Sequence, residues 1–424
     1  MDTSLEAIGT IRRKNMQQRH LQIVRFISLC VAVACSGMVV ALGAAERQSL
    51  GGGSAAITRE EALAQIRKLG GVYSSRRSER VTLLGRQVTD EALELLDALP
   101  PLEQLYLGAS QVTDRGVARL AEMTTLQVLE LEKTQITDTG LEHLKGLSRL
   151  QWLDLGQNRI TDAGLVHLKE LTQLEALLLR DTQVTDAGLK YLSALPKLSA
   201  LGLQFTEVSD AGLVHLKNLP LQSLNLWRTQ ITDDGLAHLE AFPELRWLDL
   251  ADNDITGTGL VHLGNLKALR VLRLDKTKVT DASLAHLQGL SGLEELLLGD
   301  TPITDVGLKH LDALTNLDQL SLEGTRVTGT GLRYIANLPR LRVLDLDRTQ
   351  ITDTDLASLK AMNKLQVLYL SGTQITDAGL EHLKELDLCS LDLEETRVTD
   401  AAVEELRKVL NAKRPHLPDV YIHR

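Results

Sequence analysis

Residues 150–173, LQWLDLGQNRITDAGLVHLKELTQ, change their hydrophobic period half way along. At the start, the LDL of residues 153–155 alternates apolar and polar side chains, which is typical of a half-buried strand. After a turn, Leu165, Leu168 and Leu171 follow at intervals of three residues and mark one face of a short helix. The segment therefore predicts a strand, a turn and a helix within 24 residues.

The same pattern occurs 14 times between residue 78 and about residue 411. The aspartate of its ITD motif, replaced by glycine at positions 257 and 329, returns every 24 residues, with two steps of 23. Each such aspartate follows a residue, usually threonine, that can cap the helix, so the carboxylate lies at the positive end of the helix dipole. A glycine two residues later, such as Gly164, recurs in ten units, and we infer that it permits close packing against the next unit.

A stack of such units has to curve, because its two sides need different widths. Neighbouring strands lie about 4.8 Å apart, whereas neighbouring helices need about 8 to 10 Å. We therefore expect a parallel sheet on the concave side, with helices on the convex side. The outward side chains of the sheet would be free to bind a partner.

The core of each unit resembles the leucine-rich repeat family. Its LxxLxLxxN/CxL consensus is matched by Leu150, Leu153, Leu155, Asn158 and Ile160. The ITDxGLxxLxxL half is similar to the ribonuclease-inhibitor-like and cysteine-containing subfamilies. The Asn or Cys position is threonine in ten units, and this 24-residue form resembles bacterial repeat proteins. A threonine hydroxyl can still bond the loop backbone, with fewer partners than an amide. The resemblance implies an α/β fold, a curved solenoid or horseshoe.

The N-terminal part carries a different pattern. Residues 1–25 hold five basic and two acidic groups, and residues 26–45 hold no charge. An uncharged stretch of this length can cross a membrane as a helix, and its basic flank would stay in the cytoplasm. We expect a hydrophobic helix at 26–45 that acts as a single-pass signal anchor, with the repeats outside the cytoplasm.

Two other interpretations of residues 26–45 stay open. Small residues at 43–45 resemble a signal-peptidase site, and residues 33–36 weakly resemble a lipoprotein box. Cleavage at either place would give a secreted or lipid-anchored protein. The last alternative is a buried helix of a cytoplasmic protein.

The remaining segments follow from the repeat boundaries. Residues 46–57 contain GGGS and predict a flexible linker. Residues 58–77 predict an N-terminal cap with an amphipathic helix, 78–411 are the repeats, and 412–424 predict a C-terminal cap that includes a closing strand.

Several classes of function are disfavoured by the sequence. The net charge of -10 argues against nucleic-acid binding, and the three cysteines cannot form a disulfide framework. Eight histidines recur at one helical position, which indicates a helix surface rather than a metal site. Neighbouring carboxylates such as Glu130 and Asp154 are spaced like acid-base pairs, but acidic residues recur along the whole face. Motifs such as HExxH, GxGxxG and GxSxG are missing. We therefore predict no enzymatic activity, no cofactor and no metal site.

The unusual residues fall on the predicted concave face. Trp152 and Trp247 share one column, about 19 Å apart over small residues, and Trp227 lies just after its strand. Tryptophan, tyrosine and arginine are common binding anchors, although each ring could instead cover neighbouring apolar surface. The predicted partner-binding residues are Trp152, Asp154, Trp227, Arg228, Trp247, Asp249, Arg273, Tyr106, Phe205 and Tyr369.

The predicted function is that of a membrane-anchored or exported leucine-rich repeat protein that binds another protein. The outward columns carry 15 acidic and 6 basic groups, which favours a cationic or mixed partner, and a glycan is a further possibility. The alternative is an intracellular substrate-recognition adaptor of the ubiquitin-ligase type, which would need an F-box-like helical region before the repeats. Residues 1–77 offer an apolar segment, a linker and one short helix instead.

Overall fold

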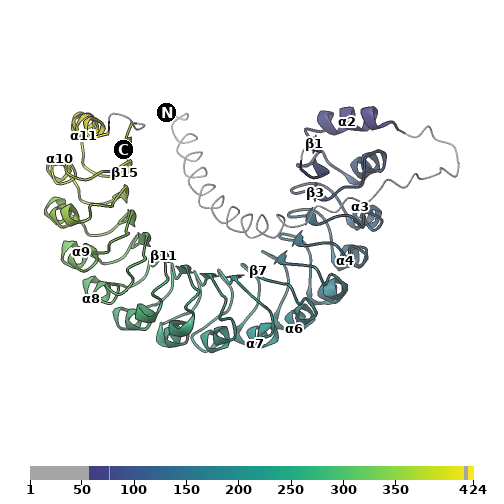
Figure 1. Ribbon diagram of the computed structural model, residues 1–424, viewed down its shortest axis with the longest axis horizontal. Coiled ribbons are helices and arrows are strands. Elements are labelled where there is room, and N and C mark those ends of the chain that lie inside the picture. Colours follow the sequence, from purple (N-terminus) through teal and green to yellow (C-terminus); the bar gives the residue numbers. More distant parts are fainter. Residues whose placement is uncertain (1–56, 76, 415–418) are drawn as a thin grey trace. The chain divides into compact units, whose positions relative to one another are not determined.

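The computed structural model describes residues 57–75, 77–414 and 419–424. Residues 57–424 form a curved stack in which strands line the concave side and helices the convex side (Figure 1). The predicted solenoid of strand–helix units with a concave parallel sheet is confirmed. The hydrophobic helix expected at 26–45 lies outside the described residues and stays a prediction. Among the described helices, none has both the length and the apolar character that a membrane crossing requires.

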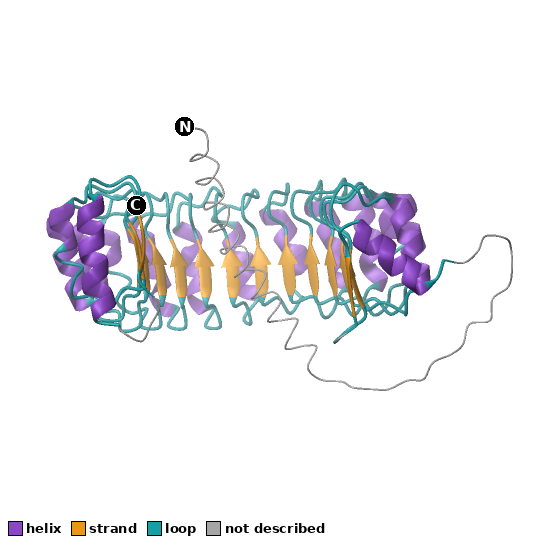
Figure 2. Ribbon diagram, turned by 90° about the horizontal axis from the view of Figure 1, so that it is seen from above, coloured by secondary structure: helices purple, strands orange, loops and turns teal. Residues whose placement is uncertain are grey.

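The strands of the described part form one 16-stranded sheet in chain order. β1 and β2 are antiparallel, and each later strand is parallel to the one before it (Figure 2). The strands are β1 (Val72–Ser74), β2 (Arg80–Thr82), β3 (Gln104–Tyr106), β4 (Val128–Glu130), β5 (Trp152–Asp154), β6 (Ala176–Leu178), β7 (Ala200–Gly202), β8 (Ser223–Asn225), β9 (Trp247–Asp249), β10 (Val271–Arg273), β11 (Glu295–Leu297), β12 (Gln319–Ser321), β13 (Val343–Asp345), β14 (Val367–Tyr369), β15 (Ser390–Asp392) and β16 (Tyr421–His423).

The helical segments of the convex side include both α-helices and 3-10 helices. Short 3-10 segments of this kind are common. They are α2 (Arg59–Lys68), η1 (Asp90–Ala98), α3 (Asp114–Leu120), α4 (Asp138–Glu142), α5 (Asp162–Leu165), η2 (Val166–Glu170), α6 (Asp186–Leu189), η3 (Lys190–Ala194), α7 (Asp210–Leu213), η4 (Val214–Leu216), η5 (Gly235–Ala241), η6 (Thr258–Asn265), η7 (Asp281–Gly289), α8 (Asp305–Leu308), α9 (Gly329–Ile335), η8 (Asp353–Ala361), α10 (Asp377–Leu380) and α11 (Asp400–Ala412).

The strand register places equivalent residues of successive repeats side by side. The central leucine of β5, Leu153, pairs with Leu129 and Leu177 and is fully buried in the apolar core. The residues before and after the central leucine face the concave side and form two columns. The first column contains Gln104, Val128, Trp152, Ala176, Ala200, Ser223, Trp247 and Val271. The second column contains Tyr106, Glu130, Asp154, Leu178, Gly202, Asn225, Asp249, Arg273, Leu297, Ser321, Asp345, Tyr369, Asp392 and His423.

The aspartate of the ITD motif forms hydrogen bonds that connect one repeat to the next. Asp138 Oδ1 accepts a hydrogen bond from the Thr161 backbone N–H at 2.8 Å, and its Oδ2 accepts one from Thr161 Oγ1 at 2.6 Å. Thr161 in turn caps α5 through the N–H of Ala163. A Cβ at Gly164 would collide with the Asp138 carboxylate, so this glycine packs against the preceding repeat and not, as expected, against the next.

The threonines at the Asn position bond the loop backbone with fewer partners than asparagine does, as the sequence predicts. Asn158 Nδ2 donates to the carbonyl oxygens of Leu131, Leu155 and Gly156 at 2.7, 3.0 and 3.1 Å. Thr182 Oγ1 donates to the Leu179 carbonyl at 2.7 Å. The amide therefore connects two repeats, whereas the bond from the Thr182 hydroxyl to Leu179 stays within one repeat.

The two ends of the described stack cover the apolar core with amphipathic helices. In α2, Ala62 and Ile66 are buried, and Thr58 and Glu61 form a capping box at the start. At the other end, α11 buries Leu406 and Leu410, and β16 pairs in parallel with β15.

Candidate interaction surface

The predicted contact residues occupy two different parts of the concave side. Trp152 and Trp247 lie in the first column, and Tyr106, Asp154, Asp249, Arg273 and Tyr369 lie in the second. Phe205, Trp227 and Arg228 lie in turns that follow β7 and β8. Phe205 and Arg228 both have left-handed backbones, with φ angles of 61° and 52°.

These turns bring aromatic and cationic side chains together. The Phe205 and Trp227 rings pack edge to face, with centroids 4.6 Å apart and an angle of 65° between their planes. The guanidinium carbons of Arg180 and Arg228 lie 5.7 and 5.5 Å from the centre of the Phe205 ring. Contacts of this kind are cation–π interactions. We call Arg180, Phe205, Trp227 and Arg228 the aromatic–arginine cluster.

The backbone explains why the cluster forms. The Phe205 N–H donates to the Trp227 carbonyl at 3.0 Å, so the parallel ladder continues one step beyond the short strands. Adjacent turns therefore stay about one strand spacing apart, close enough for their rings to touch. Arg180 was missed in the sequence, although the repeat spacing places it two units before Trp227 at the equivalent position.

The cluster is accessible, but its cations already have acidic neighbours. Phe205 and Trp227 are half-buried and Arg228 is exposed. Arg180 Nη1 lies 3.3 Å from Glu132 Oε1, and Arg228 Nε lies 3.8 Å from an Asp252 carboxylate oxygen. Pairs this exposed contribute little to stability, so their side chains can exchange partners at small cost.

Trp247 differs from the expected exposed anchor. Its side chain is only 7% exposed, whereas Trp152, in the same column, is half-buried. Trp247 stands between Ser223 and Val271 in the sheet.

The two predicted acidic contact residues are also buried. Asp249 is 1% exposed and Asp154 is 8% exposed. Each carboxylate turns back to the chain: Asp154 Oδ1 accepts from the Gly156 N–H at 2.9 Å, and Asp249 Oδ1 accepts from the Ala251 N–H at 3.0 Å. Their first role is therefore to hold the turn after the strand.

Burial weakens the acidity of this part of the concave side. It raises the pKa of Asp154 to about 8, with the Glu132 charge adding to the rise. It raises the pKa of Glu130 to about 7, again with help from Glu132. It also raises the pKa of Asp249 to about 6, although Arg273, 3.5 Å away, lowers it. A formal count of acidic residues consequently overstates the negative charge near neutral pH.

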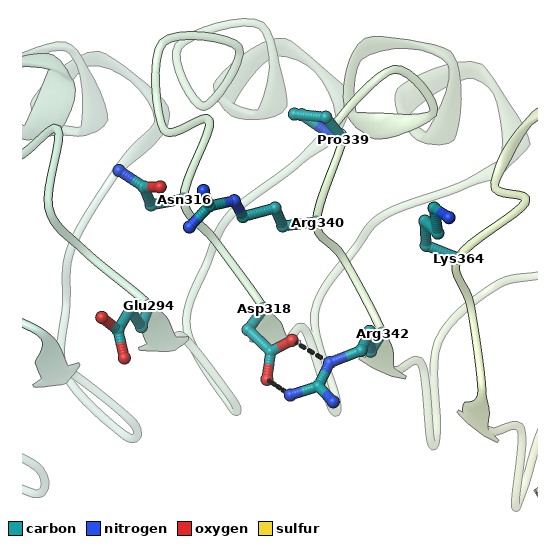
Figure 3. A pocket seen from close by; sticks show the side chains of 7 residues that line it. All are labelled: Glu294, Asn316, Asp318, Pro339, Arg340, Arg342 and Lys364. Atoms are coloured by element: carbon teal, nitrogen blue, oxygen red, sulfur yellow. Dashed lines mark hydrogen bonds and ion pairs between the residues drawn. The ribbon is translucent and has the colours of Figure 1, made fainter.

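A separate depression lies outside the predicted contact residues. It is lined by Glu294, Asn316, Asp318, Pro339, Arg340, Arg342 and Lys364 (Figure 3). Arg342 binds both carboxylate oxygens of Asp318, with Nη2 2.8 Å from Oδ2. The depression is open to solvent, and its lining charges are partly paired with one another.

Comparison with known proteins supports the fold. A leucine-rich repeat model matches residues 124–184 and 316–375, and a second one matches residues 217–239 and 245–264. An internalin structure from Listeria monocytogenes is 25% identical and has a TM-score of 0.53, covering 82% of this chain and 92% of the internalin chain. A leucine-rich repeat protein of Leptospira interrogans is 22% identical with a TM-score of 0.54, covering 76% of this chain and 79% of its own. Among curated proteins, none matches the sequence significantly.

The matches and the structure agree on the same repeating unit. The matched segments fall within the 14 units of the sequence, and the consensus leucines are the buried residues of the core. Such solenoids present an extended concave surface for binding. The chain therefore belongs to the leucine-rich repeat family, whose members are in general scaffolds and not enzymes, in agreement with the prediction of no enzymatic activity.

Proposed function

We propose that the concave side of residues 57–424 binds a protein partner and that the aromatic–arginine cluster is its principal contact. The observation that carries this proposal is the Phe205–Trp227 pair flanked by two guanidinium groups. Aromatic and arginine side chains provide most of the energy at protein interfaces. A structural role alone would not require two half-buried rings in the turns that follow β7 and β8.

The surroundings of the cluster leave room for a partner. Ala176, Ala200 and Gly202 lie on the strands beside it, so little side-chain bulk stands over this part of the concave side. The positive charges of Arg180 and Arg228 lie near Glu132 and Asp252. A partner with both cationic and acidic or aromatic side chains fits this mixture, and a purely cationic one fits less well than the sequence count suggests.

Membrane anchoring is a second part of the proposal. Residues 26–45 carry no charge and follow five basic residues, which supports a signal anchor with the repeats outside the cytoplasm. A reporter that is active only outside the cytoplasm, fused after Arg424, should then be active. A silent reporter, together with an active cytoplasmic reporter at the same place, would contradict this orientation.

The binding proposal is tested by comparing variants of the full chain. Phe205→Ala/Trp227→Ala should lower the amount of partner recovered with the protein and weaken its binding by about 30-fold or more, since the loss of such anchors costs about 2 kcal/mol. The matched control is Tyr334→Ala, because Tyr334 is 47% exposed on the convex helix α9. Equal recovery by the wild type, the double variant and the control would reject the cluster as the principal contact.

A further inference from the structure

Three metal-donor side chains meet at the C-terminal end of the sheet. Asp392 ends β15, Glu394 lies in the turn after it, and His423 ends β16. One donor atom from each of the three lies within 4.8 Å of the other two, and all three side chains are half-buried. Among the residues that the structure describes, no other group of three or more histidine, cysteine, aspartate or glutamate side chains comes this close together.

One pair of donor atoms is spaced as two ligands of a shared ion would be. Asp392 and His423 are direct partners across the parallel strands, and Asp392 Oδ1 lies 3.4 Å from His423 Nδ1. Charge-assisted hydrogen bonds are usually about 2.7 to 2.9 Å long, so this separation is long for a strong direct bond. Two ligands of a tetrahedral zinc ion, each about 2.0 to 2.1 Å from the metal, lie about 3.3 to 3.4 Å apart.

The chain holds two of the donors in place. The Glu394 N–H donates to Asp392 Oδ1 at 2.9 Å, which orients the carboxylate toward the strand end. The His423 ring lies parallel to the Tyr421 ring, with 8° between their planes and centroids 6.4 Å apart. Contacts that orient a ligand in this way reduce the entropy lost when a metal binds.

The local charge also favours a cation. Asp345 lies in the same column as Asp392, two strands away. The basic residues next to this site pair elsewhere, Arg424 with Asp400 and Arg407 with Glu404.

We propose that Asp392, Glu394 and His423 bind one divalent transition-metal ion of the zinc type, with water in the remaining coordination positions. An imidazole nitrogen with two carboxylates suits zinc and its neighbours, whereas calcium and magnesium prefer oxygen ligands alone. Because His423 comes from β16 and the other two ligands come from β15 and its turn, the ion fastens the closing strand to the last repeat. This proposal departs from the expectation from sequence of a chain without a metal site, and it does not depend on the proposed partner binding.

The experiment uses the full chain after dialysis against a chelator, titrated with zinc chloride in a calorimeter. We expect one tight site per chain, and we expect His423→Ala to weaken it by about 100-fold or more through the loss of one of three protein ligands. The control is His382→Ala, a half-buried histidine after α10 that belongs to the recurring convex position. That variant should bind zinc as the wild type does.

His423→Ala could weaken zinc binding simply by disturbing β16, so a second variant, outside that strand, is needed. Glu394→Gln keeps the size of the side chain and removes its charge, so it should lower zinc affinity while the circular-dichroism spectrum stays unchanged. Zinc should raise the melting temperature of the wild type and of His382→Ala, and should raise that of Glu394→Gln much less. Failure of the wild type to bind zinc, or equal affinity in the wild type and Glu394→Gln, would overturn the proposal.

Discussion

Gly329 lies directly against the carboxylate of Asp355 in the following repeat, so that a Cβ at position 329 would collide with it. In most other repeats the arrangement is opposite: the carboxylate of Asp305, for example, lies against Gly331. At Gly329 the two residue types have changed places. Asp355 Oδ2 accepts hydrogen bonds from Thr352 N and Thr352 Oγ1 at 2.9 and 2.8 Å, which replaces the contact that the preceding aspartate makes in other repeats.

The exchange predicts a compensating pair of substitutions. Gly329→Asp should destabilise the protein by about 2 kcal/mol, because two carboxylates would compete for one space. The double variant Gly329→Asp/Asp355→Gly restores the common arrangement and should recover most of the loss. Urea unfolding of the wild type, both single variants and the double variant measures the coupling. Simply additive losses would contradict this assignment.

A second prediction concerns the repeat core. Leu250 is fully buried behind β9, so Leu250→Ala should lower the free energy of unfolding by about 2 to 5 kcal/mol. His262→Ala removes an exposed convex side chain whose Nδ1 lies 2.7 Å from Glu240, and such exposed pairs contribute about 0 to 1 kcal/mol. Urea midpoints of the two variants provide the comparison. Similar losses at both positions would be incompatible with the repeat alignment.

A third prediction separates the tryptophans by their burial. Trp247 is only 7% exposed. Trp247→Ala should therefore leave a cavity where the ring was and destabilise the protein by about 3 kcal/mol. Trp227→Ala removes a half-buried ring and should cost less stability. Thermal unfolding of the two variants checks the order.

A fourth prediction concerns pH. The pKa of Asp154 in the folded state, about 8, lies above its value in an unfolded chain, about 3.9, so the native state binds more protons between these values. Stability from this group is complete at low pH and is lost as the pH rises toward 8. Asp154→Asn keeps an oxygen that can accept from Gly156 N and removes the titration.

The measurement is chemical unfolding at pH 5 and pH 8. Relative to the wild type, Asp154→Asn should gain stability by about 1.4 kcal/mol for each pH unit between pH 5 and pH 8, which is about 4 kcal/mol over this range. The control is Asp97→Asn, whose side chain is 66% exposed and should change neither value. A variant that is less stable than the wild type at pH 8 would disprove the inferred burial cost.

Charge reversal at Asp154 or Asp249 is unsuitable as a test of partner binding. Both carboxylates are buried and accept backbone hydrogen bonds, so a lysine would lose those bonds and bury a cation. We therefore expect destabilisation, and charge tests of binding belong at exposed residues such as Arg228.

The repeat architecture follows from the sequence alone, because 14 near-equal units with leucines at the same positions can stack in one register only. Leu153 had to lie between its counterparts in the neighbouring repeats. The hydrogen-bonding role of threonine at the Asn position was likewise predictable from the chemistry of a hydroxyl group.

Tertiary structure decided what happens where side chains from different repeats meet. From the sequence Asp154 could point to solvent or back to the Gly156 N–H, and in the folded repeat its Oδ1 accepts from that N–H. The contact of Phe205 with Trp227 depends on a left-handed turn beyond the strand, which the hydrophobic pattern does not encode. Asp392 and His423 are 31 residues apart and share no motif spacing. They meet only because the closing strand adds to the sheet in register, and that position depends on how α11 packs over the last repeat.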